Sequence, residues 1–173
     1  MGTLLLKFYS CLRLPFPDGE TNPRPRRPVA ARCRILCSNV RGLSGNLSDL
    51  AVASSQYDIL LCSESLVSDL RYVSELLVPM FGRPVLLCRG KLPRARGMAA
   101  YVRDGYGAFR QPKFECGCCD LLVVRVCGLR QNLYVCSLYR NRDQDDLIYD
   151  CLLTSMAAVQ LRMCVPRSCL WVI

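Results

Sequence analysis

The sequence of 173 residues contains no histidine. Without an imidazole, the chain has no Ser–His or Cys–His nucleophile pair, no histidine metal ligand and no histidine general base. This absence excludes the hydrolases and metalloproteins that depend on such groups within one chain. At this length the chain can form a single domain, or most of one, because 51% of its residues are hydrophobic and can bury a substantial core.

The sequence also lacks a long hydrophobic run. No stretch approaches the roughly 20 consecutive apolar residues that a membrane-spanning helix needs. The apolar run of Leu4, Leu5 and Leu6 is followed by Lys7 and is too short for the hydrophobic region of a signal peptide. Leucine at position 6 also breaks the N-myristoylation pattern. We therefore expect an intracellular protein that has no membrane partner.

Cysteine, in contrast, is abundant and odd in number, with 13 residues. A secreted disulfide framework would combine an even count with a short chain and a signal peptide. A zinc site needs four ligands in separated pairs, so we interpret the crowded thiols at 116–119 as part of a hairpin region. Six others lie in apolar, strand-like runs, and we expect them to be reduced core residues: Cys33, Cys37, Cys62, Cys88, Cys127 and Cys136.

Basic residues outnumber acidic residues by 23 to 14, and the resulting charge of +9 favours a polyanionic partner. Residues 1–31 are rich in proline and arginine, so we expect a flexible leader outside the core. A solvated leader is the favoured interpretation of its charge, and direct binding to nucleic acid is the alternative. A second basic segment either lines a DNA-facing surface or forms a solvated hairpin: Arg89, Lys91, Arg94 and Arg96.

Residues 32–160 alternate between short apolar runs and amphipathic helical patterns, which is typical of an α/β domain. Apolar runs predict strands at 34–38, 57–63, 84–88, 97–102, 121–127 and 132–138. Helical spacing of apolar residues predicts helices at 44–54, 69–78 and 143–159.

Two polar residues, Asn39 and Glu64, each follow an apolar strand. Strand ends in α/β folds deliver side chains from a rigid scaffold to a site. A carboxylate at such a place suits Mg²⁺, which takes one or two carboxylates together with water, and an asparagine can orient water or phosphate. The alternative interpretations are a turn residue for Asn39 and an ordinary exposed carboxylate for Glu64.

Four ordered motifs resemble the endonuclease/exonuclease/phosphatase domain. They are Ile35-Leu-Cys-Ser-Asn-Val-Arg-Gly-Leu43, Tyr57-Asp-Ile-Leu-Leu-Cys-Ser-Glu-Ser65, Gly97-Met-Ala-Ala-Tyr-Val-Arg103 and Leu133-Tyr-Val-Cys-Ser-Leu-Tyr-Arg140. They are most similar to the apurinic-like endonuclease domains of non-LTR retrotransposons of the LINE and jockey types. The resemblance implies a four-layer α/β sandwich of two packed mixed sheets flanked by helices. It also implies Mg²⁺-dependent hydrolysis of a phosphodiester, which nicks target DNA.

The resemblance assigns roles to individual residues. Asn39 matches the first active-site asparagine of the family, and Glu64 matches its metal-binding glutamate. Tyr139 matches the tyrosine that approaches the scissile phosphate. Arg41 and Arg140 are the corresponding substrate-binding candidates, and a solvated arginine is an equal alternative for Arg140. Such groups would stabilise the charge that develops on the phosphate.

Two family motifs are missing from this chain. The family has a Gly-Asp-x-Asn strand, whose aspartate activates the attacking water, and a Ser-Asp-His segment, whose histidine acts on the phosphate. Neither occurs here, and after Gln160 the sequence continues as a divergent tail, residues 161–173. We therefore expect a C-terminally truncated domain that is incomplete at one side of the sandwich and inactive by itself.

The codons of this tail lead to a further expectation. Trp171 is encoded by TGG and Val172 by GTN, so reading two bases later forces the glycine codon GGT. The shifted frame can then encode Val-Gly-Asp at the end of an apolar strand. We therefore expect residues 161–173 to be the product of a frameshift.

Three interpretations of function stay open. The first is a catalytically incomplete remnant of a retrotransposon endonuclease, which would be nuclear if functional. The second is a non-catalytic DNA-binding fragment that acts through the leader and the basic segment at 89–96. The third is an active phosphoesterase on a smaller substrate, against which the missing motifs count equally.

Overall fold

The computed structural model describes residues 33–88, 96–115, 119–129 and 133–139, followed by Asp150, 153–154, 157–158 and 169–172. The leader, the segment 89–95, Arg140 and most of the helix expected at 143–159 lie outside the described residues. The domain boundaries expected at 31 and 160 therefore stay predictions. Within the described part, no helix is long and apolar enough to cross a membrane.

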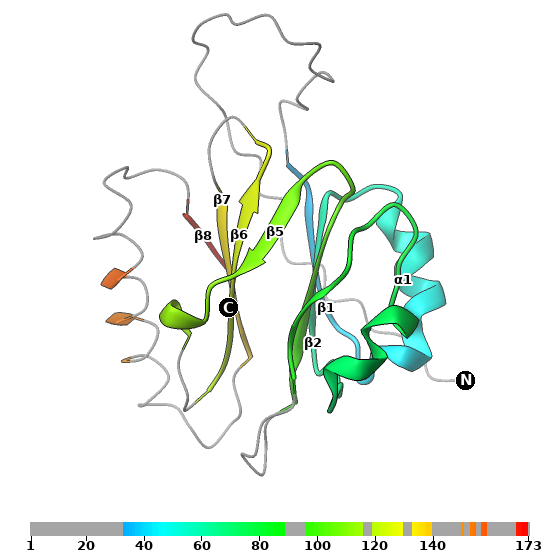
Figure 1. Cartoon of the computed structure of the whole chain (residues 1–173), viewed down its shortest axis with the longest axis horizontal. Coiled ribbons are helices and arrows are strands. Elements are labelled where there is room, and N and C mark those ends of the chain that lie inside the picture. The colour runs from blue at the N-terminus through cyan, green and yellow to red at the C-terminus, as the bar shows by residue number, and fades with distance from the viewer. Residues whose placement is uncertain are drawn as a thin grey trace, which may run out of the picture.

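Two four-stranded mixed sheets form the centre of the molecule (Figure 1). The first has the order β1-β2-β4-β3, in which β1 and β2 are parallel and β4 is antiparallel to both of its neighbours. The second has the order β5-β6-β7-β8, in which only β7 and β8 are parallel. The strands are β1 (Ile35–Asn39), β2 (Ile59–Ser63), β3 (Val85–Leu87), β4 (Met98–Val102), β5 (Gly107–Arg110), β6 (Asp120–Cys127), β7 (Leu133–Tyr139) and β8 (Cys169–Val172).

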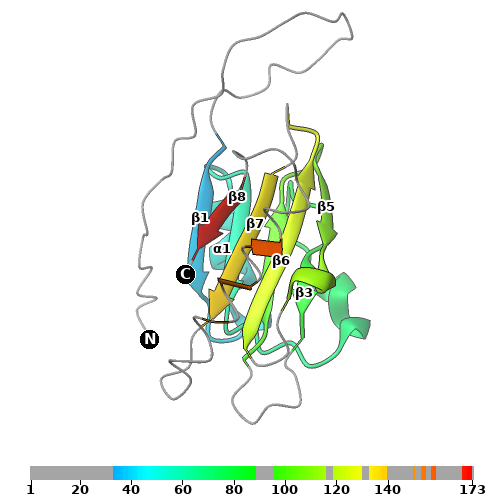
Figure 2. The same ribbon diagram turned by 90° about the vertical axis from the view of Figure 1, so that its left-hand side faces the viewer.

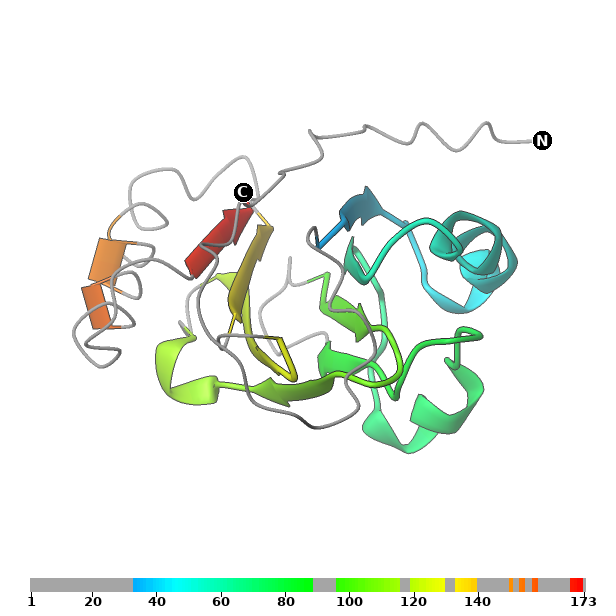
Figure 3. The same ribbon diagram turned by 90° about the horizontal axis from the view of Figure 1, so that it is seen from above.

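Helical segments cover the outer face of the first sheet (Figure 3). A short 3-10 turn, η1 (Ser44–Asn46), leads into α1 (Leu47–Ser54), as the apolar spacing at 44–54 predicts. The helix expected at 69–78 is instead a shorter 3-10 helix, η2 (Leu70–Glu75). Its N-cap Asp69 accepts a bond from the Arg71 amide, and the β-branched Val73 lowers α-helix propensity there. A third 3-10 turn, η3 (Pro112–Phe114), precedes β6.

The hydrophobic core has two parts because both faces of the first sheet are buried. On β2, Ile59 and Leu61 face the second sheet and pack in the core between the two sheets. The alternate residues Leu60 and Cys62 face the other way and pack with Leu50 of α1. Helical residues at 153–154 and 157–158 lie outside the second sheet (Figure 1). The expected four-layer α/β sandwich is therefore confirmed, and strands buried on both faces explain the continuous apolar runs.

The residues of the tail that are described join the second sheet. Cys169–Val172 forms β8, which pairs in parallel with β7 from Tyr134 to Ser137. β1 and β8 are the end strands of their sheets and lie on the same side of the sandwich (Figure 2). Strand formation by this segment does not depend on its origin, because aromatic and β-branched residues such as Trp171 and Val172 favour strands. The frameshift stays a prediction.

The expected core cysteines are not equally buried. Cys33, Cys62 and Cys136 are buried, whereas Cys37, Cys88 and Cys127 are half-buried. Position accounts for the difference: Cys88 follows the last residue of β3, Cys127 is the last residue of β6, and Cys37 lies on β1, an end strand of its sheet. Residues 116–118 of the thiol-rich hairpin lie outside the described residues.

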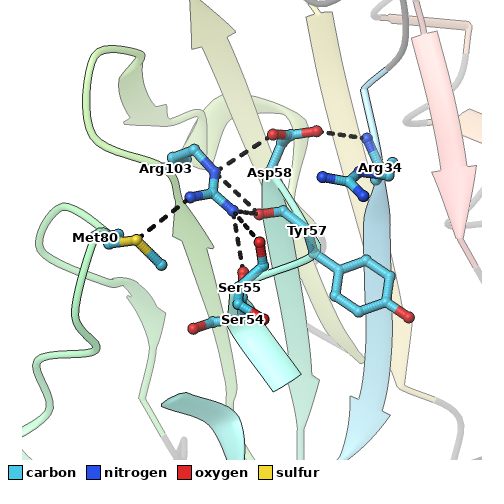
Figure 4. A network of polar contacts seen from close by, with 7 residues as sticks. All are labelled: Arg34, Ser54, Ser55, Tyr57, Asp58, Met80 and Arg103. Atoms are coloured by element: carbon cyan, nitrogen blue, oxygen red, sulfur yellow. Dashed lines mark hydrogen bonds and ion pairs between the residues drawn. The ribbon is translucent and has the colours of Figure 1, made fainter. Parts of the chain in front are cut away.

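Arg103, directly after β4, connects this end of the first sheet to α1 and the loop that follows it (Figure 4). Its guanidinium group donates hydrogen bonds to the carbonyl oxygens of Tyr57 and Ser54 at the C-terminal end of α1. It also forms an ion pair with Asp58, at 3.4 Å between Nε and Oδ1, and stacks over the ring of Phe81. An arginine at this place satisfies carbonyl groups that the helix leaves unpaired.

Candidate active site

Five strand ends meet at the opposite end of the sandwich. β1 and β2 are parallel, and their register places Asn39 beside Ser63, the residue before Glu64. β4 runs antiparallel to β2, so its first residue, Met98, lies beside Ser63. In the second sheet, the last residue of β7, Tyr139, pairs with the first residue of β6. The topology therefore gathers side chains from both sheets at this end.

The three residues expected to be catalytic are in contact with one another. Asn39 donates a hydrogen bond from Nδ2 to Oε1 of Glu64 at 2.9 Å. Tyr139 donates from its hydroxyl group to the same oxygen at 2.6 Å. The Asn39 side-chain oxygen accepts a bond from the Arg41 amide at 3.2 Å, which fixes the orientation of the Asn39 amide group. Glu64 is therefore held by one donor from each sheet.

Backbone strain is concentrated at this site. Arg41, Glu64 and Leu66 have φ angles of 46°, 52° and 55°, in the left-handed region that side chains with a Cβ atom disfavour. Hydrogen bonds between the loops after β1 and β2 maintain this conformation. The amides of Gly42 and Leu43 donate to the carbonyl oxygens of Glu64 and Ser65 at 2.8 and 2.9 Å. Strain that the surroundings maintain in this way is typical of functional sites.

A second support comes from Arg96 and Gly97, directly before β4. Their carbonyl oxygens accept bonds from the amides of Leu66 and Ser65 at 2.9 and 3.1 Å. Their own amides donate to one oxygen of Asp120, at 2.7 and 3.1 Å. Sequence reasoning did not identify Asp120. The available signal was a carboxylate at the start of an otherwise apolar strand, because a buried carboxylate requires partners.

The charges around Glu64 favour its ionised form. Partial burial by itself raises the pKa of the Glu64 carboxyl group. The hydrogen bonds from Tyr139 and Asn39, together with the positive charges of Arg96 and Arg41, outweigh burial and hold the pKa below its usual value. Burial, followed by the hydrogen bond to Glu64 and its negative charge, raises the pKa of Tyr139 to about 12. At neutral pH the pair is therefore a carboxylate and a neutral phenol.

The donor set at this site suits a hard cation. Both hydrogen bonds to Glu64 go to Oε1, and no described residue donates a hydrogen bond to Oε2. A carboxylate oxygen and the amide oxygen of Asn39 are ligands of the kind that Mg²⁺ prefers. Among the described residues, however, no group of three or more histidine, cysteine, aspartate or glutamate side chains is arranged to hold a metal ion. The described residues therefore fit one part of a magnesium site.

Of the two arginines predicted to bind substrate, the structure describes Arg41 but not Arg140. Arg41 lies in the strained loop after β1, and its charge acts on Glu64. Arg140 lies outside the described residues, as do Arg89, Lys91 and Arg94 of the basic segment. The described residue of that segment, Arg96, lies close enough to Glu64 for its charge to lower the Glu64 pKa. Arg41 and Arg96 thus make the surroundings of Glu64 positive.

Comparisons with known proteins address the fold. No protein-family model matches the sequence, and no curated protein matches it. Among solved structures, the endonuclease domain of TRAS1, a telomere-specific non-LTR retrotransposon, superimposes with a TM-score of 0.54 and 17% identity. The aligned region covers 80% of this chain and 58% of that chain. The chain has the fold of this endonuclease domain.

A second structure is similar to a smaller extent. The AP endonuclease LMAP from Leishmania major matches with a TM-score of 0.47 and 16% identity, over 75% of this chain and 46% of that chain. For the TRAS1 endonuclease domain, whose fold this chain has, the chain spans less than two thirds of the length.

Proposed function

We propose that this chain is part of an apurinic-like DNA endonuclease domain of a non-LTR retrotransposon. The observation that carries the proposal is the contact of Glu64 with both Asn39 and Tyr139, which come from different sheets. The endonuclease fold supports the same conclusion. In a complete domain the reaction is Mg²⁺-dependent hydrolysis of a phosphodiester, which nicks DNA in the nucleus.

Each residue at the site has a definite part in this proposal. Glu64 would hold Mg²⁺, which when bound would polarise a phosphoryl oxygen and stabilise its charge. The Asn39 amide group keeps the Glu64 carboxylate in one orientation. Tyr139 presents a neutral hydroxyl group, which is a hydrogen-bond donor for a phosphate oxygen. Arg41, Arg96 and Arg140 supply positive charge for the DNA backbone.

We further propose that this chain by itself does not cleave DNA. It contains no histidine and no Gly-Asp-x-Asn motif, so it lacks the groups that the family uses to activate water and to act on the phosphate. Loss of a general base reduces the rate of hydrolysis by orders of magnitude. What the described residues retain is the Glu64 carboxylate with positive charges beside it. A non-catalytic DNA-binding fragment is therefore the second candidate, favoured by Arg41 and Arg96 beside Glu64.

Two measurements with the full chain test these statements. We expect no Mg²⁺-dependent nicking of supercoiled plasmid. Nicking that Glu64→Ala abolishes would contradict the inactivity. We also expect DNA binding that weakens with salt, measured by gel shift.

The gel shift also tests the site itself. The double variant Arg41→Ala, Arg96→Ala should bind more weakly and with a smaller salt dependence, because each phosphate contact contributes about 0.9 to the slope. Arg83→Ala, at an exposed arginine, is the matched control and should leave binding unchanged. Equal effects of both changes would show that DNA does not bind at Glu64.

A further inference from the structure

A buried carboxylate stands at the start of β6, in the sheet opposite Glu64. Asp120 is only 9% exposed. Its Oδ2 atom accepts hydrogen bonds from two backbone amides, those of Arg96 at 2.7 Å and Gly97 at 3.1 Å. A carboxylate is costly to bury without such partners. Because Arg96 and Gly97 lead directly into β4, Asp120 ties the second sheet to the first at the end of the sandwich that holds the site.

The segment that Asp120 holds is the one that supports Glu64. The carbonyl oxygens of Arg96 and Gly97 accept bonds from the amides of Leu66 and Ser65. Ser65 directly follows Glu64, whose backbone is strained at a φ angle of 52°. Displacement of Arg96 and Gly97 would therefore release one of the two sets of hydrogen bonds that maintain this backbone conformation.

Tyr139 connects Asp120 to Glu64 by a second route. In the antiparallel register of β6 and β7, Asp120 pairs with Tyr139. Tyr139 in turn donates its hydroxyl hydrogen bond to Glu64. Among the described residues, Tyr139 links the two sheets at this end directly through Glu64, and Asp120 links them through the hydrogen bonds that it accepts from the Arg96 and Gly97 amides. We propose that Asp120 is a positioning residue, which holds the Arg96–Gly97 segment so that Glu64 meets Tyr139.

This inference assigns Asp120 a part in the site of the proposed function, and it is tested without DNA or metal. The probe is the Cζ resonance of Tyr139 at neutral pH in the full chain labelled with ¹³C-tyrosine, assigned with Tyr139→Phe. The resonance in Glu64→Ala gives the value for a broken hydrogen bond. We expect Asp120→Ala to move the resonance most of the way to that value. We also expect hydrogen exchange at the Ser65 and Leu66 amides to accelerate about tenfold, the factor that corresponds to one net hydrogen bond.

Two conservative variants separate geometry from charge. Both amides donate to a single oxygen of Asp120, so Asp120→Asn can keep both bonds and should retain the Tyr139 resonance. Asp120→Glu keeps the charge but displaces the carboxylate, and it should shift the resonance. This pair of variants decides the matter if Asp120→Ala does not fold.

Arg103→Ala controls for loss of stability alone. It weakens the opposite end of the sheet and should leave the Tyr139 resonance in place. The proposal is overturned if Asp120→Ala and Asp120→Glu leave the resonance unchanged, or if Asp120→Asn shifts it as far as Asp120→Glu does. A negative gel shift would contradict the proposed function and leave this result standing.

Discussion

The hydroxyl group of Tyr139 lies 2.6 Å from Oε1 of Glu64, although the two residues are 75 positions apart and come from different sheets. The contact can form only when the two sheets are packed in their native arrangement. It therefore reports on the tertiary structure of the site as well as on its chemistry.

Tyr139 and Glu64 should be energetically coupled. We expect Tyr139→Phe to lower the free energy of unfolding by about 1 kcal/mol, because a hydrogen bond to a charged but partly exposed group is lost. In a Glu64→Ala background the same change should cost close to nothing. A double-mutant cycle by urea unfolding measures the difference. Tyr134→Phe, on the same strand, is the control and should show no coupling to Glu64, since its ring contacts Phe114.

The strained backbone at Glu64 leads to a second prediction. Glu64→Gly and Glu64→Ala remove the same side-chain hydrogen bonds, but only glycine adopts a φ angle of 52° without strain. We expect the glycine variant to be more stable than the alanine variant by about 0.5–1 kcal/mol. Val52 is exposed in α1, where glycine is unfavourable, so Val52→Ala should be more stable than Val52→Gly by about 1 kcal/mol. An alanine variant at 64 as stable as the glycine variant would contradict the strain.

Arg103 should be among the most important charged residues for stability. Arg103→Ala removes hydrogen bonds to several carbonyl groups and the ion pair with Asp58, so we expect a loss of about 2–3 kcal/mol in urea unfolding. Arg83→Ala, at an exposed arginine, should change stability by less than about 0.5 kcal/mol. Similar losses for the two variants would show that the Arg103 contacts contribute little.

The buried thiols should be unreactive in the native state. Burial, with a smaller effect of the Asp58 charge, raises the pKa of Cys33 to about 12. Burial and the neighbouring Cys37 do the same for Cys62. At pH 8 only about one thiol in ten thousand is then ionised, and the thiolate is the reactive form. We expect peptides that contain these cysteines to stay unmodified by iodoacetamide until urea is added, as measured by mass spectrometry. Equal labelling in native and unfolded protein would contradict the burial.

The frameshift can be checked at the DNA level. Beyond the codon for Trp171, the shifted frame should continue through Gly-Asp-x-Asn and later reach a Ser-Asp-His segment. Sequencing of the locus decides the matter. An early stop codon in the shifted frame, or a frame without these motifs, would rule out the frameshift.

The sequence predicts the centre of the fold better than its edges. β2 and β4 are buried on both faces, so their apolar runs identify them without knowledge of their partners. β5 was not predicted, because Gly107–Arg110 is short and only partly buried and has no apolar run. The expected helix at 69–78 is reduced to η2, because local capping at Asp69 and i→i+3 bonds determine its form.

The same contrast applies to the site. Asn39 and Glu64 could be predicted, because each follows a recognisable strand and the family motifs include both. Their contact with Tyr139 depends on the packing of the two sheets. The support from Asp120 depends on where the chain before β4 meets β6, which local patterns do not encode. Long-range register therefore accounts for what sequence reasoning missed.

The Arg103 cluster has a consequence for motion in the first sheet. Its charged side chain holds the beginning of β2 and the end of β4 against α1, while three residues after β1 and β2, at the other end of the sheet, have a disfavoured backbone conformation. Local opening should therefore start at the strained end and stop before Arg103. Such opening would displace Asn39 and Glu64 together, while the Arg103 end of the sheet keeps its native contacts.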